Sequence, residues 1–216
     1  METPFRTADI PFSGDRSSDA AANALLIWVS RFTHMFGTVV TPDDSVQETI
    51  RRAVDGDVIT MMPGTYKISS PLLINKAVEV RAFGRVLVSG SGTLCKLTAS
   101  GAAVIGVRFS STGTSEALQI DASRCRVVSC WVDCPGNKGI TVTSNGDSSS
   151  IGDCYFEYSS SHSGSTDYDI YWNDGATNGR VWGSTHSTTR AYVLSHRSAD
   201  SLIEAANGRS AIIDAR

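Results

Sequence analysis

The amino-acid sequence predicts an all-β fold in which short strands stack as a repeated coil. The first observation is a repeat inside Gly101–His196. Three segments place an apolar or small side chain at a first position and again three and five residues later, and a fourth has His186 at its last position: Ala102–Ser110, Arg126–Cys134, Ser150–Tyr158 and Arg180–His186. The first positions of successive segments are 23, 24 and 30 residues apart. A period in the twenties built from β-branched and small side chains is typical of stacked strands.

Two further observations support this prediction. Each of the four segments is followed by a second strand-like piece: Ala117–Ile120, Gly139–Val142, Asp169–Trp172 and Ala191–Leu194. The residues between are mainly Gly, Ser, Thr, Asn and Asp, which favour turns. Only 19% of the residues are charged and 8% are aromatic. This composition suits turn-rich β architecture better than helices.

The N-terminal segment 1–41 differs from the repeat. Residues 1–17 are polar and show no periodicity, so we expect an extended arm that needs a neighbour to order it. A helix is predicted from Ser17 or Ser18 to about Phe36. Its apolar face consists of Leu25, Trp28, Val29, Phe32 and Phe36. This face either packs on the coil or binds a partner or another copy.

A short capping helix is predicted at residues 45–54. Ser45-Val-Gln-Glu48 has the capping-box pattern, in which the Ser45 side chain accepts from the Glu48 amide and the Glu48 side chain returns to the Ser45 amide. A strand then turns at Pro63-Gly64, and two strand-like pieces follow, Leu72–Asn75 and Ala77–Ala82. We expect the helix to cover the open end of the coil, where bare strand edges would otherwise attract other chains.

The stretch "VQETIRRAVDGDVITMMPGTYKISSPLLINKAVEVRAFG" resembles the opening of pectin-lyase-like right-handed parallel β-helix proteins. The later segments "VVSCWVDC", "SSIGDCYFEY", "ALQI" and "GITV" are similar to the coils of that superfamily. The resemblance implies a single-stranded right-handed parallel β-helix over residues 42–216, and the length allows about seven short coils. In style the chain is closest to the structural β-helices of viruses and phages. The superfamily also includes pectate lyases, polygalacturonases and pectin esterases, so the fold alone leaves the function open.

The five cysteines lie inside the repeat region: Cys95, Cys125, Cys130, Cys134 and Cys154. Cys130 and Cys154 occupy equivalent positions, so we expect them to be neighbours on the inside of the coil. Small buried thiols are one interpretation. Disulfides within the coil, or a bridge to a partner, are the alternatives. The spacing of Cys130 and Cys134 lacks the further ligands of a zinc site, and we predict no metal and no cofactor.

The best enzymatic candidates are Asp153, Asp167, Asp169 and Arg180. Hydrolysis on this fold requires paired carboxylates facing one groove, and lyase chemistry requires several acids with a basic residue. The acids of the coils do not recur at one repeat position. The alternative interpretation is that these aspartates hold turns by accepting from backbone amides.

An aromatic group is a second candidate surface, for sugar rings or for another protein. It combines Tyr155 with Tyr158, Tyr168, Tyr171, Trp172 and Trp182, which lie around the longest loop of the repeat. Side chains alternate between the two faces of a strand, so part of this group is expected inside the coil.

Charge and hydropathy narrow the partners. The net charge is −3 and the basic residues are scattered, which argues against nucleic acid. The most apolar run, Ala20–Ser30, is about 11 residues long, well short of the roughly 20 that span a bilayer. The first residues lack the basic start of a signal peptide. We therefore expect a chain that is made in a host cytoplasm, without a signal peptide or transmembrane segment.

These observations favour a non-enzymatic structural protein. The sequence-based hypothesis is a virion component, such as a capsid decoration or cement protein or a small fibre or spike. It would be a homo-oligomer, a trimer, that docks on other structural proteins of the same assembly through residues 1–41. The alternative is a polysaccharide-active enzyme or a carbohydrate-binding module that uses the acids and aromatics near residues 153–182.

Overall fold

The computed structural model describes residues 37–134, 138–157, 168–173 and 175–186, together with three short strands near the C-terminus. The chain divides into two units, Met1–Gly37 and Thr38–Arg216. The predicted arm and helix, with Leu25, Trp28, Val29, Phe32 and Phe36, lie outside the described residues. No helix of the described part is long and apolar enough to cross a membrane.

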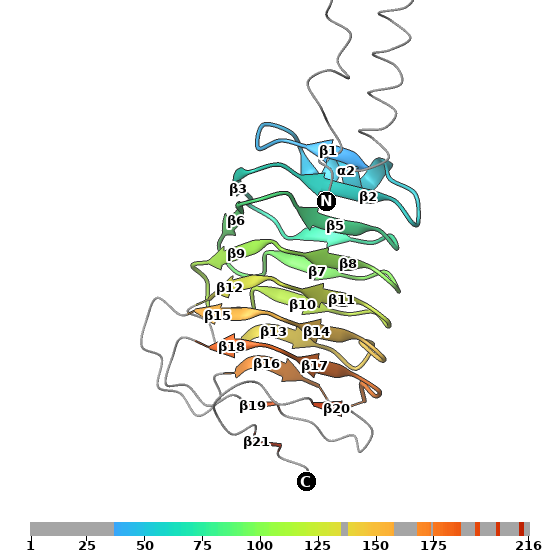
Figure 1. Ribbon diagram of the computed structural model, residues 1–216, viewed down its shortest axis with the longest axis vertical. Coiled ribbons are helices and arrows are strands. Elements are labelled where there is room, and N and C mark those ends of the chain that lie inside the picture. The colour runs from blue at the N-terminus through green and yellow to red at the C-terminus, as the bar shows by residue number, and fades with distance from the viewer. Residues whose placement is uncertain are drawn as a thin grey trace, which may run out of the picture. The chain divides into compact units, whose positions relative to one another are not determined.

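The unit from Thr38 onward is built from three parallel sheets, here named A, B and C (Figure 1). Sheet A contains β1 (Thr38–Val40), β2 (Val58–Met61), β5 (Glu79–Ala82), β8 (Ala103–Ile105), β11 (Arg126–Val128), β14 (Ser150–Gly152), β17 (Arg180–Trp182) and β20 (Leu202–Ile203). Sheet B contains β3 (Gly64–Lys67), β6 (Val86–Gly90), β9 (Arg108–Ser111), β12 (Trp131–Asp133), β15 (Tyr155–Glu157) and β18 (Thr185–His186). Sheet C contains β4 (Leu72–Ile74), β7 (Cys95–Leu97), β10 (Leu118–Ile120), β13 (Lys138–Val142) and β16 (Tyr168–Trp172). A further parallel pair joins β19 (Val193–Leu194) to β21 (Ile212–Ile213).

The chain visits the sheets in the order A, B, C, and each strand pairs in register with the strand one coil later. This is a parallel β-helix, as predicted. Each of the five strands of sheet C completes one coil, so the described residues hold five complete coils. The prediction of about seven is too high, because the last predicted coils fall after His186, where only short strands are described. The right-handed sense stays an expectation from the resemblance.

A single residue with positive φ turns the chain from sheet A to sheet B. This A–B corner column is formed by Gly106, Ser129, Asp153 and Gly183, with φ of 72°, 53°, 50° and 59°. Backbone bonds run along it, from Ser129 N–H to the Gly152 carbonyl and from Asp153 N–H to the Trp182 carbonyl, both 2.9 Å. Each of the four predicted segments is therefore two short strands meeting at a corner.

A second column of positive φ lies where the chain passes from sheet C to sheet A. It consists of Gly101, Arg124, Ser148 and Asn178, with φ of 82°, 57°, 56° and 55°. Each lies two residues before a strand of sheet A, at the same register position. The repeat of 23 or 24 residues thus reflects two left-handed corners at fixed places in each coil.

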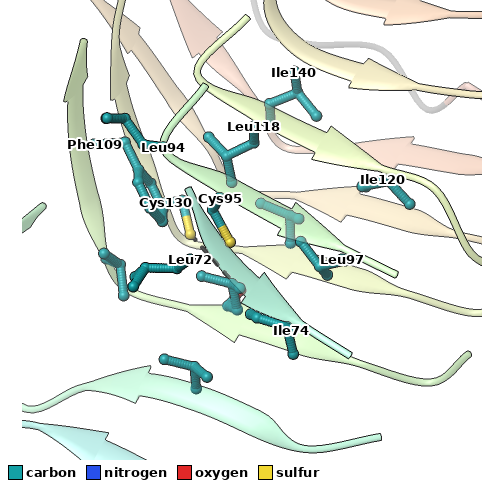
Figure 2. Packing of buried hydrophobic residues seen from close by; sticks show 14 of the residues in the cluster. Leu72, Ile74, Leu94, Cys95, Leu97, Phe109, Leu118, Ile120, Cys130 and Ile140 are labelled. Carbon is teal, nitrogen blue, oxygen red and sulfur yellow. Dashed lines mark hydrogen bonds between the residues drawn. The ribbon is translucent and has the colours of Figure 1, made fainter. Parts of the chain in front are cut away.

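The core is a column of apolar side chains enclosed by the three sheets (Figure 2). On sheet C, Leu72, Cys95, Leu118 and Ile140 align in register and are all buried. Cys130 and Cys154 are likewise buried neighbours on successive coils, which confirms the prediction for this pair. Stacking like side chains at one register position gives each coil the same interior as the next.

The capping helix α2 (Val46–Arg52) packs against β1, β2 and β4 at the N-terminal end of the coil. Its N-cap Ser45 accepts from the Glu48 amide, as predicted. The returning half of the capping box is wrong, because the Glu48 carboxylate accepts from Arg51 and Arg52 instead. At the other end of the helix, Lys76 Nζ donates to the Arg51 carbonyl.

Strand β1 adds to the edge of sheet A and pairs with β2. It lies within residues 1–41, which the sequence analysis assigned to the N-terminal segment. Among the described residues, β1 is therefore the first strand of the β-helix.

Candidate interaction surfaces on sheets A and B

The outer face of sheet B carries a row of large side chains, one from each of three successive coils. Arg108, Trp131 and Tyr155 are directly paired in register. The Arg108 guanidinium carbon lies 4.2 Å from the centre of a Trp131 ring. The Trp131 and Tyr155 rings meet edge to face, with centroids 4.6 Å apart. Trp131 remains 36% exposed, so this row presents an aromatic surface to solvent.

Acidic side chains lie beside this row, at the C-terminal ends of strands β12 and β15. Glu157 accepts from Trp131 Nε1 at 3.0 Å and from Arg108 Nη2 at 3.4 Å. On the preceding coil, Asp133 Oδ2 accepts from Ser110 Oγ at 3.3 Å, while its buried Oδ1 has no donor among the described residues. Coils are numbered from the first, β2–β4, so that coil four is β11–β13, coil five is β14–β16 and coil six begins with β17. Sheet B therefore presents one carboxylate on coil four and one on coil five.

The outer face of sheet A is more basic. Glu79 pairs with Arg126 at 3.4 Å, reaching past the small Ala103, and with Arg81 at 3.9 Å. The Arg126 side chain is 53% exposed. Arg180 is also exposed and forms no ion pair with a described residue.

An apolar strip lies beside these arginines on sheet A. Ile105, Val128 and Trp182 are half-buried and alternate with the inward positions of their strands. A Cβ on Gly152 would lie 2.0 Å from Cε2 of Trp182, so the indole lies directly against the Gly152 backbone. Glycine at this position allows the aromatic ring to lie flat on the sheet.

The outer face of sheet C is mixed. Leu73, Lys96, Gln119, Thr141 and Tyr171 share one register position. Lys138 Nζ lies 3.7 Å from the centre of the Tyr171 ring. Leu73 is 43% exposed at the N-terminal edge. The described side chains of this face form neither a row of stacked rings nor a cluster of one charge.

The structure does not gather the predicted acids into one described site. Asp153 occupies the A–B corner, with Oδ1 2.1 Å from where a Cβ on Gly183 would be. Asp169 is buried on β16 of sheet C, and Arg180 is exposed at the start of β17 of sheet A. Asp167 lies outside the described residues. Asp153 is therefore on a different part of the coil from Asp169 and Arg180.

The predicted aromatic group is divided among the three sheets. Tyr171 is on sheet C and Trp182 on sheet A. Trp172 points into the core, where it is 1% exposed and donates to the Ala176 carbonyl, so its assignment to an interaction surface is wrong. Tyr158 lies outside the described residues, as does the side chain of Tyr168.

The sequence analysis missed Trp131, Arg108 and Arg126. Strand alternation could have identified Trp131, because it lies between Cys130 and Val132, both at inward positions of the repeat. Tyr155 has the same place one coil later.

All five cysteines are free and buried. Burial raises the pKa of Cys95 to about 12 and that of Cys125 to about 11. The Cys130 thiol donates to backbone carbonyls of Val104 and Val128. These contacts agree with the interpretation of the cysteines as small core residues.

A cleft of about 260 Å³ lies at the N-terminal end, between residues 42–47 and 66–72. The Tyr66 hydroxyl at its wall donates to the Val40 and Met62 carbonyls. No group of three or more His, Cys, Asp or Glu side chains is placed to hold a metal ion within the described ranges.

The geometry defines the class: the described part of the chain from Thr38 onward is a parallel β-helix. No protein-family model matches it, and no curated protein matches it. Among solved structures it is similar to ORF18 of Geobacillus virus E2, with a TM-score of 0.59 and 14% identity over 88% of this chain and 44% of that one. It is also similar to the PL6 family polysaccharide lyase Pedsa3628 from Pseudopedobacter saltans (TM-score 0.48, 18% identity, 77% of this chain and 46% of that one). A third is the pectate lyase Pel9A (TM-score 0.34, 12% identity, 83% and 81%).

The chain spans less than half the length of the first two of these structures. At such low identities the likeness shows the fold alone.

Proposed function

We propose that this protein is a structural component of a virion, a capsid decoration or cement protein or a small fibre or spike. The protein acts as a homotrimer, and residues 1–41 attach it to other structural proteins of the assembly. The phage origin of one solved structure with the same fold supports this proposal.

The observation that carries the proposal is the unbroken register of the coils. Sheet A runs through neighbouring parallel strands from β1 to β17, with matched partners at each step. At about 4.8 Å per strand, the seven strands span roughly 29 Å from the first to the last. Such a ladder gives a rigid spacer that holds its two ends at a fixed separation.

The mass in solution tests the trimer and the role of the N-terminal segment. Light scattering compares the full chain with a chain that begins at Thr38, which keeps β1 on sheet A. We expect a trimer that falls to a monomer on truncation. A full chain that is monomeric would contradict the proposal.

The presence of the protein in virions is tested separately. Mass spectrometry of gradient-purified particles that carry the gene should find the protein in a fixed ratio to the major capsid protein. Its absence from complete particles would rule out a virion role.

The second candidate is a polysaccharide-active enzyme or sugar-binding protein. The exposed Trp131 ring, with Tyr155 and Arg108 beside it, favours this candidate because sugar rings stack on such surfaces. Quenching of tryptophan fluorescence by a panel of polysaccharides, lost in Trp131→Ala and kept in Leu73→Ala, would support it. Turnover of any of them would make it an enzyme.

A further inference from the structure

We infer that copies of this chain pack side by side, with the outer face of sheet A of one copy against the outer face of sheet B of the next. This inference rests on the proposed trimer and names its contact surfaces. The occupant of each face is a second copy of the same chain.

Opposite charges lie near the same height on the two faces, in addition to the pairs Arg126–Glu79 and Arg108–Glu157 that each face forms within itself. Sheet A presents Arg126 on coil four and Arg180 on coil six, both exposed. Sheet B presents Asp133 on coil four and Glu157 on coil five. If two copies lie parallel, residues of equal height meet, and Arg126 faces Asp133 while Arg180 lies within one coil of Glu157. Opposite charges at matched positions fix both the partner and the register of an interface.

The apolar parts of the two faces match as well. Sheet A offers Ile105, Val128 and Trp182, and sheet B offers Trp131 and Tyr155. Aromatic residues and arginines are the residue types enriched at the centres of protein interfaces. On sheet C the described side chains form no such row, and the proposed contact leaves this face toward solvent.

The corner between the two faces is narrow. Two residues separate the strands there, and the first of each pair forms the A–B corner column of Gly106, Ser129, Asp153 and Gly183. Small side chains allow neighbouring copies to approach closely along this edge. Because sheets A and B are different surfaces, a repeated A-to-B contact is heterologous, and the proposed trimer requires that the rotation between copies closes after three steps.

Each face is small. Three strand residues across five coils cover roughly 10 by 24 Å, an area of about 240 Å². This area is smaller than the approximately 800 Å² that each partner buries in a typical stable complex. The contact therefore adds to the attachment made by residues 1–41, and the test must use the full chain.

The experiment measures the mass of the full chain by light scattering across a dilution series. Three charge reversals are compared with the unchanged chain: Arg126→Glu, Asp133→Arg, and the two together. Arg180→Glu is a third single reversal, at a residue without an ion pair among the described residues. Lys96→Glu on sheet C is the matched control. Circular dichroism checks that each variant is folded.

We expect each single reversal on sheet A or B to weaken assembly roughly tenfold or more, as repulsion replaces attraction. The double reversal should restore assembly, and Lys96→Glu should leave it unchanged. If folded single variants assemble like the unchanged chain, or if Lys96→Glu weakens assembly as much as they do, the inference is overturned while the trimer stands. If the unchanged full chain is a monomer, the proposed function itself fails.

Discussion

The side-chain amide of Gln47 pairs with the backbone of Leu73 through two hydrogen bonds, as a neighbouring strand would. Gln47 Nε2 donates to the Leu73 carbonyl at 3.2 Å, and the Leu73 amide donates to Gln47 Oε1 at 2.8 Å. Leu73 is on β4, the last strand of sheet C at its N-terminal side. One helix side chain thus satisfies backbone groups that a sheet edge leaves open.

Loss of this pairing should weaken the fold. Gln47→Glu keeps an acceptor for the Leu73 amide but removes the donor to its carbonyl, and places a carboxylate beside that carbonyl. We expect a loss of about 1–3 kcal/mol in the free energy of unfolding, measured in urea. Gln119→Glu, on the same face of sheet C but within the stack, is the control and should change stability much less. Equal losses in both variants would show that the pairing is unimportant.

Ser129 tests the strain at the A–B corner. Its φ is 53°, a region in which a β-branched side chain is strongly disfavoured. Ser129→Val should cost about 1–2 kcal/mol. Ser129→Gly should be nearly neutral, because relief of strain offsets the greater freedom of glycine in the unfolded chain. Ser150→Val on β14, in extended backbone, is the control. A Ser129→Val variant as stable as the unchanged chain would contradict the corner geometry.

Two glycines that contact tryptophans should respond differently to a methyl group. A Cβ on Gly179 would lie 1.9 Å from Cζ2 of Trp172, which is fully buried and cannot move aside. A Cβ on Gly152 meets Trp182 at 2.0 Å, but that indole is half-exposed and can swing outward. Thermal unfolding should show a loss of about 1–3 kcal/mol or more for Gly179→Ala and a smaller one for Gly152→Ala. The reverse order would contradict the placement of the two rings.

The buried thiols should react slowly with thiol reagents in the folded chain. They should also lower the free energy of unfolding at alkaline pH. Burial raises the pKa of Cys95 to about 12, so the folded chain keeps a proton that the unfolded chain releases near pH 9. Stability from this group is complete below about pH 9 and is lost as the pH rises toward 12. Cys95→Ala should flatten this part of the pH profile. Aromatic disulfide reagents should titrate the five thiols after unfolding and react little at pH 8 before it.

Glu48 should affect stability in acid. Its pKa is lowered to about 2, first by the hydrogen bond from Arg51 and also by Arg52. A lowered pKa means that its contribution is present above about pH 4.5 and is lost as the pH falls toward 2. Glu48→Gln should reduce the change of stability over that range, measured by urea unfolding at several pH values. Glu116→Gln is the control, and an equal reduction there would contradict the role of Glu48.

Much of the fold follows from local signals. Val127, Cys130 and Val132 mark the inward positions of one coil, and the same pattern one period later predicts Ile151, Cys154 and Phe156. The Ser45 cap of α2 also follows from a local pattern. Such features depend on residues close in the chain or repeated at a fixed period.

Apart from Trp131 and Tyr155, which strand alternation indicates, the residues of the candidate surfaces could not be predicted in the same way. The position of each corner decides which sheet holds Tyr171, Trp172 and Trp182. A shift of the corner by one residue would turn inward side chains outward. Arg108 and Glu157 are 49 residues apart in the sequence. Their side chains meet because the fold places their strands only two coils apart, at a backbone separation of about 10 Å. The Glu48 carboxylate likewise forms salt bridges with Arg51 and Arg52 in place of the capping-box hydrogen bond, because both arginines lie about one helical turn away.

The two corner columns make the coil a modular unit of length. A segment such as Arg126–Ser149 makes one full coil, because the next residue, Ser150, pairs with Arg126. Duplicating or deleting such a segment keeps α2 at one end and the order of the sheets unchanged. Descendants of this gene could therefore tune the reach of the rod in increments of about 4.8 Å without redesigning either end.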